Sequence, residues 1–131
     1  MKVISDFLIR KGYRVSRASQ HKPNYHLTAM YNEKCARILV RNLQFDSAYK
    51  ESPLPYQVYK IDAFETPEEQ AVAIKDIDFV VGYNFKNASF ACLDINEFME
   101  KRSRVVHGRD GLKSEYYNSW HLLDDYVSRN Y

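Results

Sequence analysis

The sequence is poor in the residues that build disulfide frameworks, flexible linkers and metal clusters. Its 131 residues include two cysteines, four glycines, four prolines and a single tryptophan. Cys35 and Cys92 are too few for a disulfide framework and lack metal-ligand spacing, so we expect them to be buried free thiols of a cytosolic protein. No Gly/Ser-rich stretch divides the chain, and this length supports one good core, so we predict a single domain over residues 1–131.

Long hydrophobic runs are also absent. No apolar stretch approaches the roughly 20 residues that a membrane-spanning helix needs, and the opening residues 1–6 are too short and too charged for a signal peptide. We therefore expect a cytoplasmic protein with no membrane partner. A hydrophobic content of 45% and a charged content of 27% are ordinary for a globular protein and argue against disorder.

Positive charge is in small excess, with a formal net charge of +2, but the charged residues are unevenly placed along the chain. Residues 1–22 carry six Lys or Arg against one acid, and residues 101–113 carry five against one. Residues 43–98, between them, hold ten acids and four bases. The two basic segments could meet as one positive face that attracts nucleic acid, or they could be a solvated distribution without a role.

The first half of the chain predicts a helix, a short strand and a β-hairpin. Residues 2–11 carry the apolar stripe of an amphipathic helix and end at a glycine, and residues 13–16 follow as a strand. Residues 25–30 and 36–41 alternate between apolar and polar side chains on either side of a tight polar turn, which predicts a hairpin. If Tyr31 pairs with Lys34 across that turn, residue 26 lies opposite residue 39 on one face.

The second half predicts further strands and helices. We expect a strand over 56–64, a capped helix from Thr66-Pro67 to about Asp76, and strands over 79–83 and 89–93. A helix from 94 to about 106 and a last helix from about 116 to 127 complete the prediction. The fold class is thus α/β, a mixed sheet flanked by helices, with a core over 1–106 and a C-terminal helical extension over 107–131.

This order of elements resembles that of the PD-(D/E)XK nuclease superfamily, the restriction-endonuclease-like fold. Gly12-Tyr13-Arg14-Val15 matches the end of the opening helix and the short strand that follow in that family. Residues 25–29 stand where the family has an aromatic residue, an Asp and apolar alternation, and residues 37–41 stand where its strand ends in Glu-x-Lys. The stretch 78–98 resembles a hairpin-then-helix of several such nucleases.

The resemblance implies a Mg²⁺ site held by two carboxylates, with a lysine that positions or activates the attacking water. The positions equivalent to those three residues are His26, Leu39 and Arg41. Leucine binds no metal, histidine is a poor ligand for a hard cation, and arginine is a poor proton acceptor. We therefore predict a degenerate active site with no catalytic residue at the family positions and no cofactor, Mg²⁺ being expected only if acids elsewhere rebuild the site.

Three functions stay open at this point. The first is a nuclease-fold protein that binds nucleic acid, duplex DNA in preference, without cutting it. The second is an active Mg²⁺-dependent endonuclease with displaced acids. The third is a protein-interaction module or regulatory subunit, as a homodimer or with another protein, that uses its tyrosine-rich surface and C-terminal helix. For the first function, the predicted nucleic-acid-binding residues are Arg14, Arg17, Lys22, Arg41, Lys101, Arg102 and Arg104.

Overall fold

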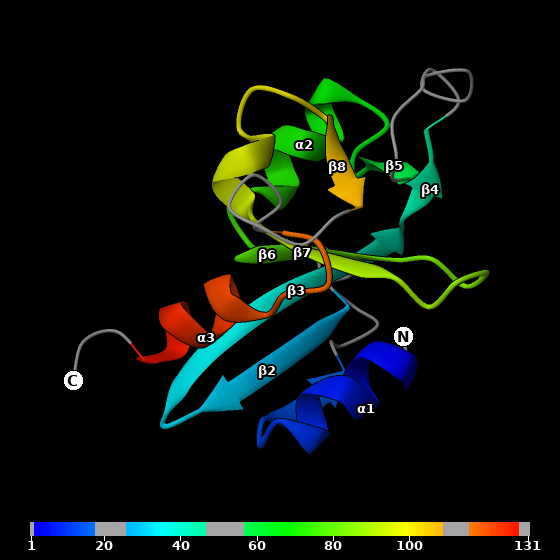
Figure 1. Cartoon of the computed structure of the whole chain (residues 1–131). Helices are drawn as coiled ribbons and strands as arrows, with labels where there is room; N and C mark the ends of the chain where they lie inside the picture. Colours follow the sequence, from blue (N-terminus) through cyan, green and yellow to red (C-terminus); the bar gives the residue numbers. More distant parts are fainter. Residues whose placement is uncertain (1, 18–25, 47–56, 109–115, 129–131) are drawn as a thin grey trace.

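A computed structural model describes residues 2–17, 26–46, 57–108 and 116–128 (Figure 1). It is an α/β structure, as predicted. Its elements in chain order are α1 (Lys2–Arg10), β1 (Arg14–Arg17), β2 (Leu27–Tyr31), β3 (Lys34–Asn42), β4 (Gln44–Phe45), β5 (Gln57–Asp62), α2 (Pro67–Ala73), β6 (Phe79–Tyr83), β7 (Phe90–Asp94), the 3-10 helix η2 (Ile95–Phe98), β8 (Ser103–Gly108) and α3 (His121–Ser128).

The main sheet has five strands in the order β1-β2-β3-β6-β7. Strands β3 and β6 are parallel, and the other neighbours are antiparallel. The predicted hairpin and its register are confirmed, because Tyr31 pairs with Lys34 and Leu27 pairs with Ile38. Its two turn residues, Asn32 and Glu33, both have positive φ, which suits the twist of a two-residue hairpin loop.

Each face of the main sheet carries its own hydrophobic core. On one face, Ile38 and Phe79 pack with side chains of α1 and α3. On the other face, Leu39 and Val80 pack with side chains of α2, β5 and β8. Figure 1 shows these two layers on opposite sides of the sheet. Because β6 lies between both cores, all five of its residues are buried, as its unbroken apolar sequence predicts.

The second layer contains a sheet that the sequence did not predict. Strands β4, β5 and β8 form a three-stranded sheet, in which β8 pairs antiparallel with β5. The predicted helix from 94 to about 106 is therefore wrong: the chain makes only η2 and then extends into β8. Met99, just after η2, is 50% exposed, and the β-branched pair Val105-Val106 alternates across the strand, with Val106 buried opposite Tyr59.

Two further expectations need correction. The last helix, α3, begins at His121, and Tyr117 before it forms an isolated bridge with Ala91. Cys92 is a buried free thiol as expected, but Cys35 is exposed, because it lies beside the hairpin turn on the less covered part of β3.

In the described segments, no helix is long and apolar enough to cross a membrane.

Candidate functional site

Leu39 and Arg41 lie two residues apart on β3 and point to the same face of the main sheet. Leu39 is only 2% exposed and belongs to the core beneath the second sheet. Both residues line a cavity of about 370 Å³ against α2, together with Phe64 and Glu69. The position that the resemblance assigns to the family's second acid is therefore an apolar core position at the edge of a cavity.

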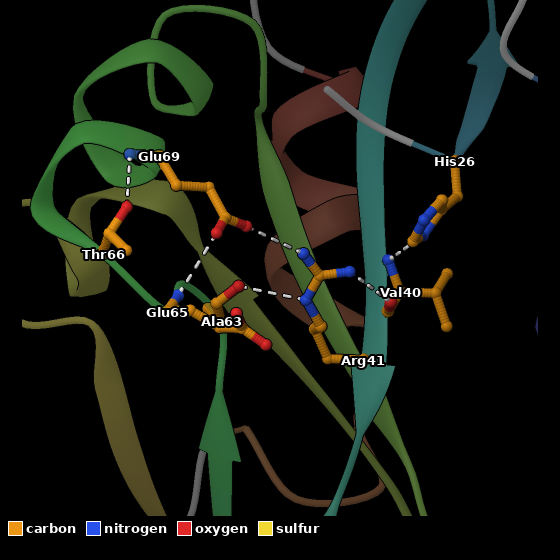
Figure 2. Close-up of polar contacts among 7 residues, drawn as sticks. All are labelled: His26, Val40, Arg41, Ala63, Glu65, Thr66 and Glu69. Carbon is orange, nitrogen blue, oxygen red and sulfur yellow. Dashed lines mark hydrogen bonds and ion pairs between the residues drawn. The ribbon is translucent and has the colours of Figure 1, made fainter. Parts of the chain in front are cut away.

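Polar contacts of Arg41 link β3 to α2 and to the residues just before α2 (Figure 2). Its Nε donates a hydrogen bond to the carbonyl oxygen of Ala63 at 3.0 Å, and its Nη2 lies 3.5 Å from Oε1 of Glu69. Glu69 is held in place in turn, because its backbone N–H donates to Oγ1 of the helix cap Thr66 and its Oε2 accepts from the backbone N–H of Glu65. The guanidinium also lies 3.5 Å, through Nη1, from the carbonyl oxygen of Val40, so it has three protein partners while remaining partly exposed.

His26 extends the hydrogen bonding between β2 and β3 with both its backbone and its side chain. Its backbone N–H donates to the carbonyl oxygen of Ile38 at 2.9 Å, and its Nδ1 accepts the backbone N–H of Val40 at 3.1 Å (Figure 2). Burial, and secondly the charge of Arg41, lower the pKa of His26 below its ordinary value. A neutral imidazole that accepts at Nδ1 carries its proton at Nε2, so neither ring nitrogen offers a lone pair to a metal.

A larger cleft of about 1060 Å³ extends from Arg41 between the ends of β5 and β8. Three bases and four acids line it: Arg41, Lys101, Arg102, Asp62, Glu65, Glu69 and Glu100. Asp62 accepts from Oγ of Ser103 at 2.6 Å, and this hydrogen bond is the main reason that its pKa is lowered. The sequence did not point to these acids, because the capping pattern at Thr66 predicts where α2 begins but not that it packs beside β3.

The residues present do not fit the Mg²⁺ site that the resemblance implies. No three His, Cys, Asp or Glu side chains in the described ranges converge so that they could hold a metal ion. Leu39 has no ligand atom, both nitrogens of His26 are engaged or protonated, and Glu69 is paired with Arg41. The arrangement can present cationic and hydrogen-bonding groups, but it cannot chelate a hard cation at the family positions.

The structure divides the predicted nucleic-acid-binding residues into separate groups. Arg41, Lys101 and Arg102 line the same cleft, and Arg102 donates to the carbonyl oxygen of Glu65. Arg104 instead pairs with Glu97 at 3.1 Å.

The register of β1 separates its two arginines. Arg14 pairs with Met30 and Arg17 with Leu27, three residues apart, so their side chains leave β1 on opposite faces. Leu27 belongs to the core beneath α1, so Arg14 shares the face of Arg41 and Arg17 does not. Lys22 lies outside the described residues.

Comparisons with known proteins agree with the fold. A model of the PD-(D/E)XK endonuclease family matches residues 1–123. The structure of a bacterial homing endonuclease, I-Ssp6803I, superposes with a TM-score of 0.65 and 17% sequence identity, over 93% of this chain and 83% of that one. No curated protein matches significantly.

Proposed function

We propose, from the premise that this chain belongs to the PD-(D/E)XK endonuclease family, that it binds nucleic acid, duplex DNA in preference, and has lost metal-dependent cleavage. One observation carries the proposal. Leu39, at the position that the resemblance assigns to the family's second oxygen ligand, is buried in a hydrophobic core. Replacing Leu39 by an acidic residue does not by itself create a metal site, because burying a carboxylate without a partner costs free energy.

Charge near the N-terminus supports binding. Residues 2–17 include five exposed bases, Lys2, Arg10, Lys11, Arg14 and Arg17, and one acid, Asp6. Of these bases, Lys11 is paired with Asp124 at 3.0 Å. The cleft beside Arg41 is less attractive to phosphate, because its acids outnumber its bases. We therefore expect most phosphate contacts to come from α1 and β1, and the contribution of Arg41 to be weakened by Glu69.

An active nuclease with displaced acids is the second candidate, because Asp62, Glu65 and Glu69 line the same cleft as Arg41. Its acids would have to leave their present partners, which include Ser103 and Lys60 for Asp62 and Arg41 for Glu69. This candidate predicts cleavage that depends on those carboxylates, whereas the first predicts binding alone.

Two assays on the purified full chain test the proposal. Fluorescence anisotropy with a labelled blunt DNA duplex should detect binding at low salt that weakens steeply as salt is raised, as phosphate contacts require. Supercoiled plasmid incubated with Mg²⁺ or Mn²⁺ should remain uncut. Nicking that disappears in Asp62→Asn or Glu69→Gln would establish the displaced-acid nuclease instead. Absence of binding at low salt would favour the protein-interaction module.

A further inference from the structure

Three cavities beside β3 share lining residues, each with at least one of the others. The cavity of about 370 Å³ and the cleft of about 1060 Å³ share Arg41. That cleft in turn shares Gln44 with a third cavity of about 260 Å³, which lies between the β3–β4 connection and the β6–β7 turn. We infer that this third cavity, here called the aromatic slot, holds an unpaired nucleobase of the bound nucleic acid; the inference rests on the proposed function.

Phe85 forms one wall of the aromatic slot and is held out in solvent by its turn. It is 70% exposed, more than any other large hydrophobic side chain in the described residues. The turn is rigidly built, because the buried side chain of Asn84 donates to the carbonyl oxygen of Leu43 at 2.8 Å and accepts the backbone N–H of Lys86 at 2.9 Å. The Phe85 ring also packs edge-on against Tyr83, with centroids 4.8 Å apart. A ring fixed in an exposed position loses little conformational entropy when a ligand stacks on it.

Phe45 contributes a second aromatic surface, which ends a stack of three rings. Its ring stacks on Tyr59 with centroids 5.6 Å apart, and Tyr59 stacks on Tyr117 at 5.7 Å. Tyr59 is buried and held by Asn87, whose Nδ2 donates to its hydroxyl at 2.7 Å. Phe45 itself is 41% exposed, so the stack ends in a partly open ring at the slot.

The polar groups around these rings are those that recognise nucleotides. Asn42, Gln44 and Lys86 line the slot, and the amide nitrogen of Gln44 donates to Oδ2 of Asp62 at 3.4 Å, in the neighbouring cleft. Amides can pair with the edge of a base, aromatic rings stack on its face, and an ammonium attracts the adjoining phosphate. A base inside a duplex hides both faces in the stack, so only an unpaired or extruded base can enter such a site.

Binding measurements on the full chain with three DNA probes test this inference. The probes are a blunt duplex, the same duplex with one single-base bulge, and a single strand of the same sequence. We expect the bulged duplex, which offers both a double helix and an unpaired base, to bind more tightly than either the blunt duplex or the single strand. Phe85→Ala should weaken binding of the bulged duplex and of the single strand by about 5- to 150-fold, the range for losing one stacked base, and leave the blunt duplex unchanged. Phe85→Trp should preserve the preference.

A second readout and a matched control separate stacking from general effects. A 2-aminopurine at the bulge should change its fluorescence on binding the wild-type chain but not Phe85→Ala. Val72→Ala removes a similarly exposed apolar side chain from α2, away from the aromatic slot, and should bind all three probes like wild type.

Each remaining outcome overturns a definite claim. Equal binding of all three probes, or an equal loss for all three in Phe85→Ala, would refute the slot while leaving the proposed function intact. A wild-type chain that binds no probe at low salt would refute both. A Phe85→Ala change that dissociates an oligomer in light scattering, with the probe preference retained, would make this surface a contact between copies of the chain.

Discussion

Replacing Leu39 by glutamate tests whether the family position is now part of the core. The substitution introduces the residue type that the resemblance assigns to this position, where the leucine side chain is 2% exposed and surrounded by apolar neighbours. Burial raises the pKa of a carboxyl group, so the substituted chain should fold with this group protonated.

The expected cost has two parts. Loss of a fully buried leucine side chain costs about 1.5–3 kcal/mol. Holding the carboxyl group neutral at pH 7.5, about 3 units above the ordinary glutamate pKa, costs about 4 kcal/mol more. A raised folded-state pKa leaves stability intact below the unfolded-state pKa of about 4.3 and removes it as the pH rises, so only about 1 kcal/mol of this second part remains at pH 5.

Urea unfolding at pH 5 and pH 7.5 measures the difference. Leu39→Glu should lose about 4 kcal/mol more than Leu39→Gln at the higher pH, because glutamine has the same size and polarity but does not titrate. At pH 5 the two variants should differ by only about 1 kcal/mol. If Leu39→Glu were as stable as Leu39→Gln at both pH values, the carboxylate would be ionised and accommodated. The position would then still accept a metal ligand, contrary to our reasoning.

Two further predictions concern charge and thiol chemistry. Arg14→Ala combined with Arg17→Ala should flatten the slope of log affinity against log salt by up to about 2 units, since each phosphate contact contributes about 0.9. Arg41→Ala should flatten it by less than one full contact, because Glu69 already neutralises part of its charge; a loss of about 0.9 would contradict this pairing. One thiol should react with a disulfide reagent in the native chain and two after denaturation, because Cys35 is exposed whereas burial encloses Cys92 and raises its pKa. Burial, and secondly the charge of Asp78, also raise the pKa of Cys35, so its reaction at pH 8 should be slower than that of a free thiol; two native thiols of equal rate would contradict the fold.

Local patterns determined several elements correctly because their signals lie within a few residues. The hairpin register follows from alternation on both sides of a two-residue turn, and it places Leu39 and Arg41 on one face of β3. The start of α2 follows from Thr66, whose side chain accepts the backbone N–H of Glu69 as the capping pattern predicts. The burial of β6 on both faces follows from its unbroken apolar sequence.

Only the tertiary structure decided the second sheet and what surrounds Arg41. Residues 94–106 carry spacing that fits a helix, but pairing with β5, more than forty positions away, favours the extended strand β8. The same long-range packing brings Glu69 to Arg41 and the β6–β7 turn to Gln44. Which surfaces bury one another is determined only in the folded chain. The pattern of neighbouring residues in the sequence therefore does not predict these partners.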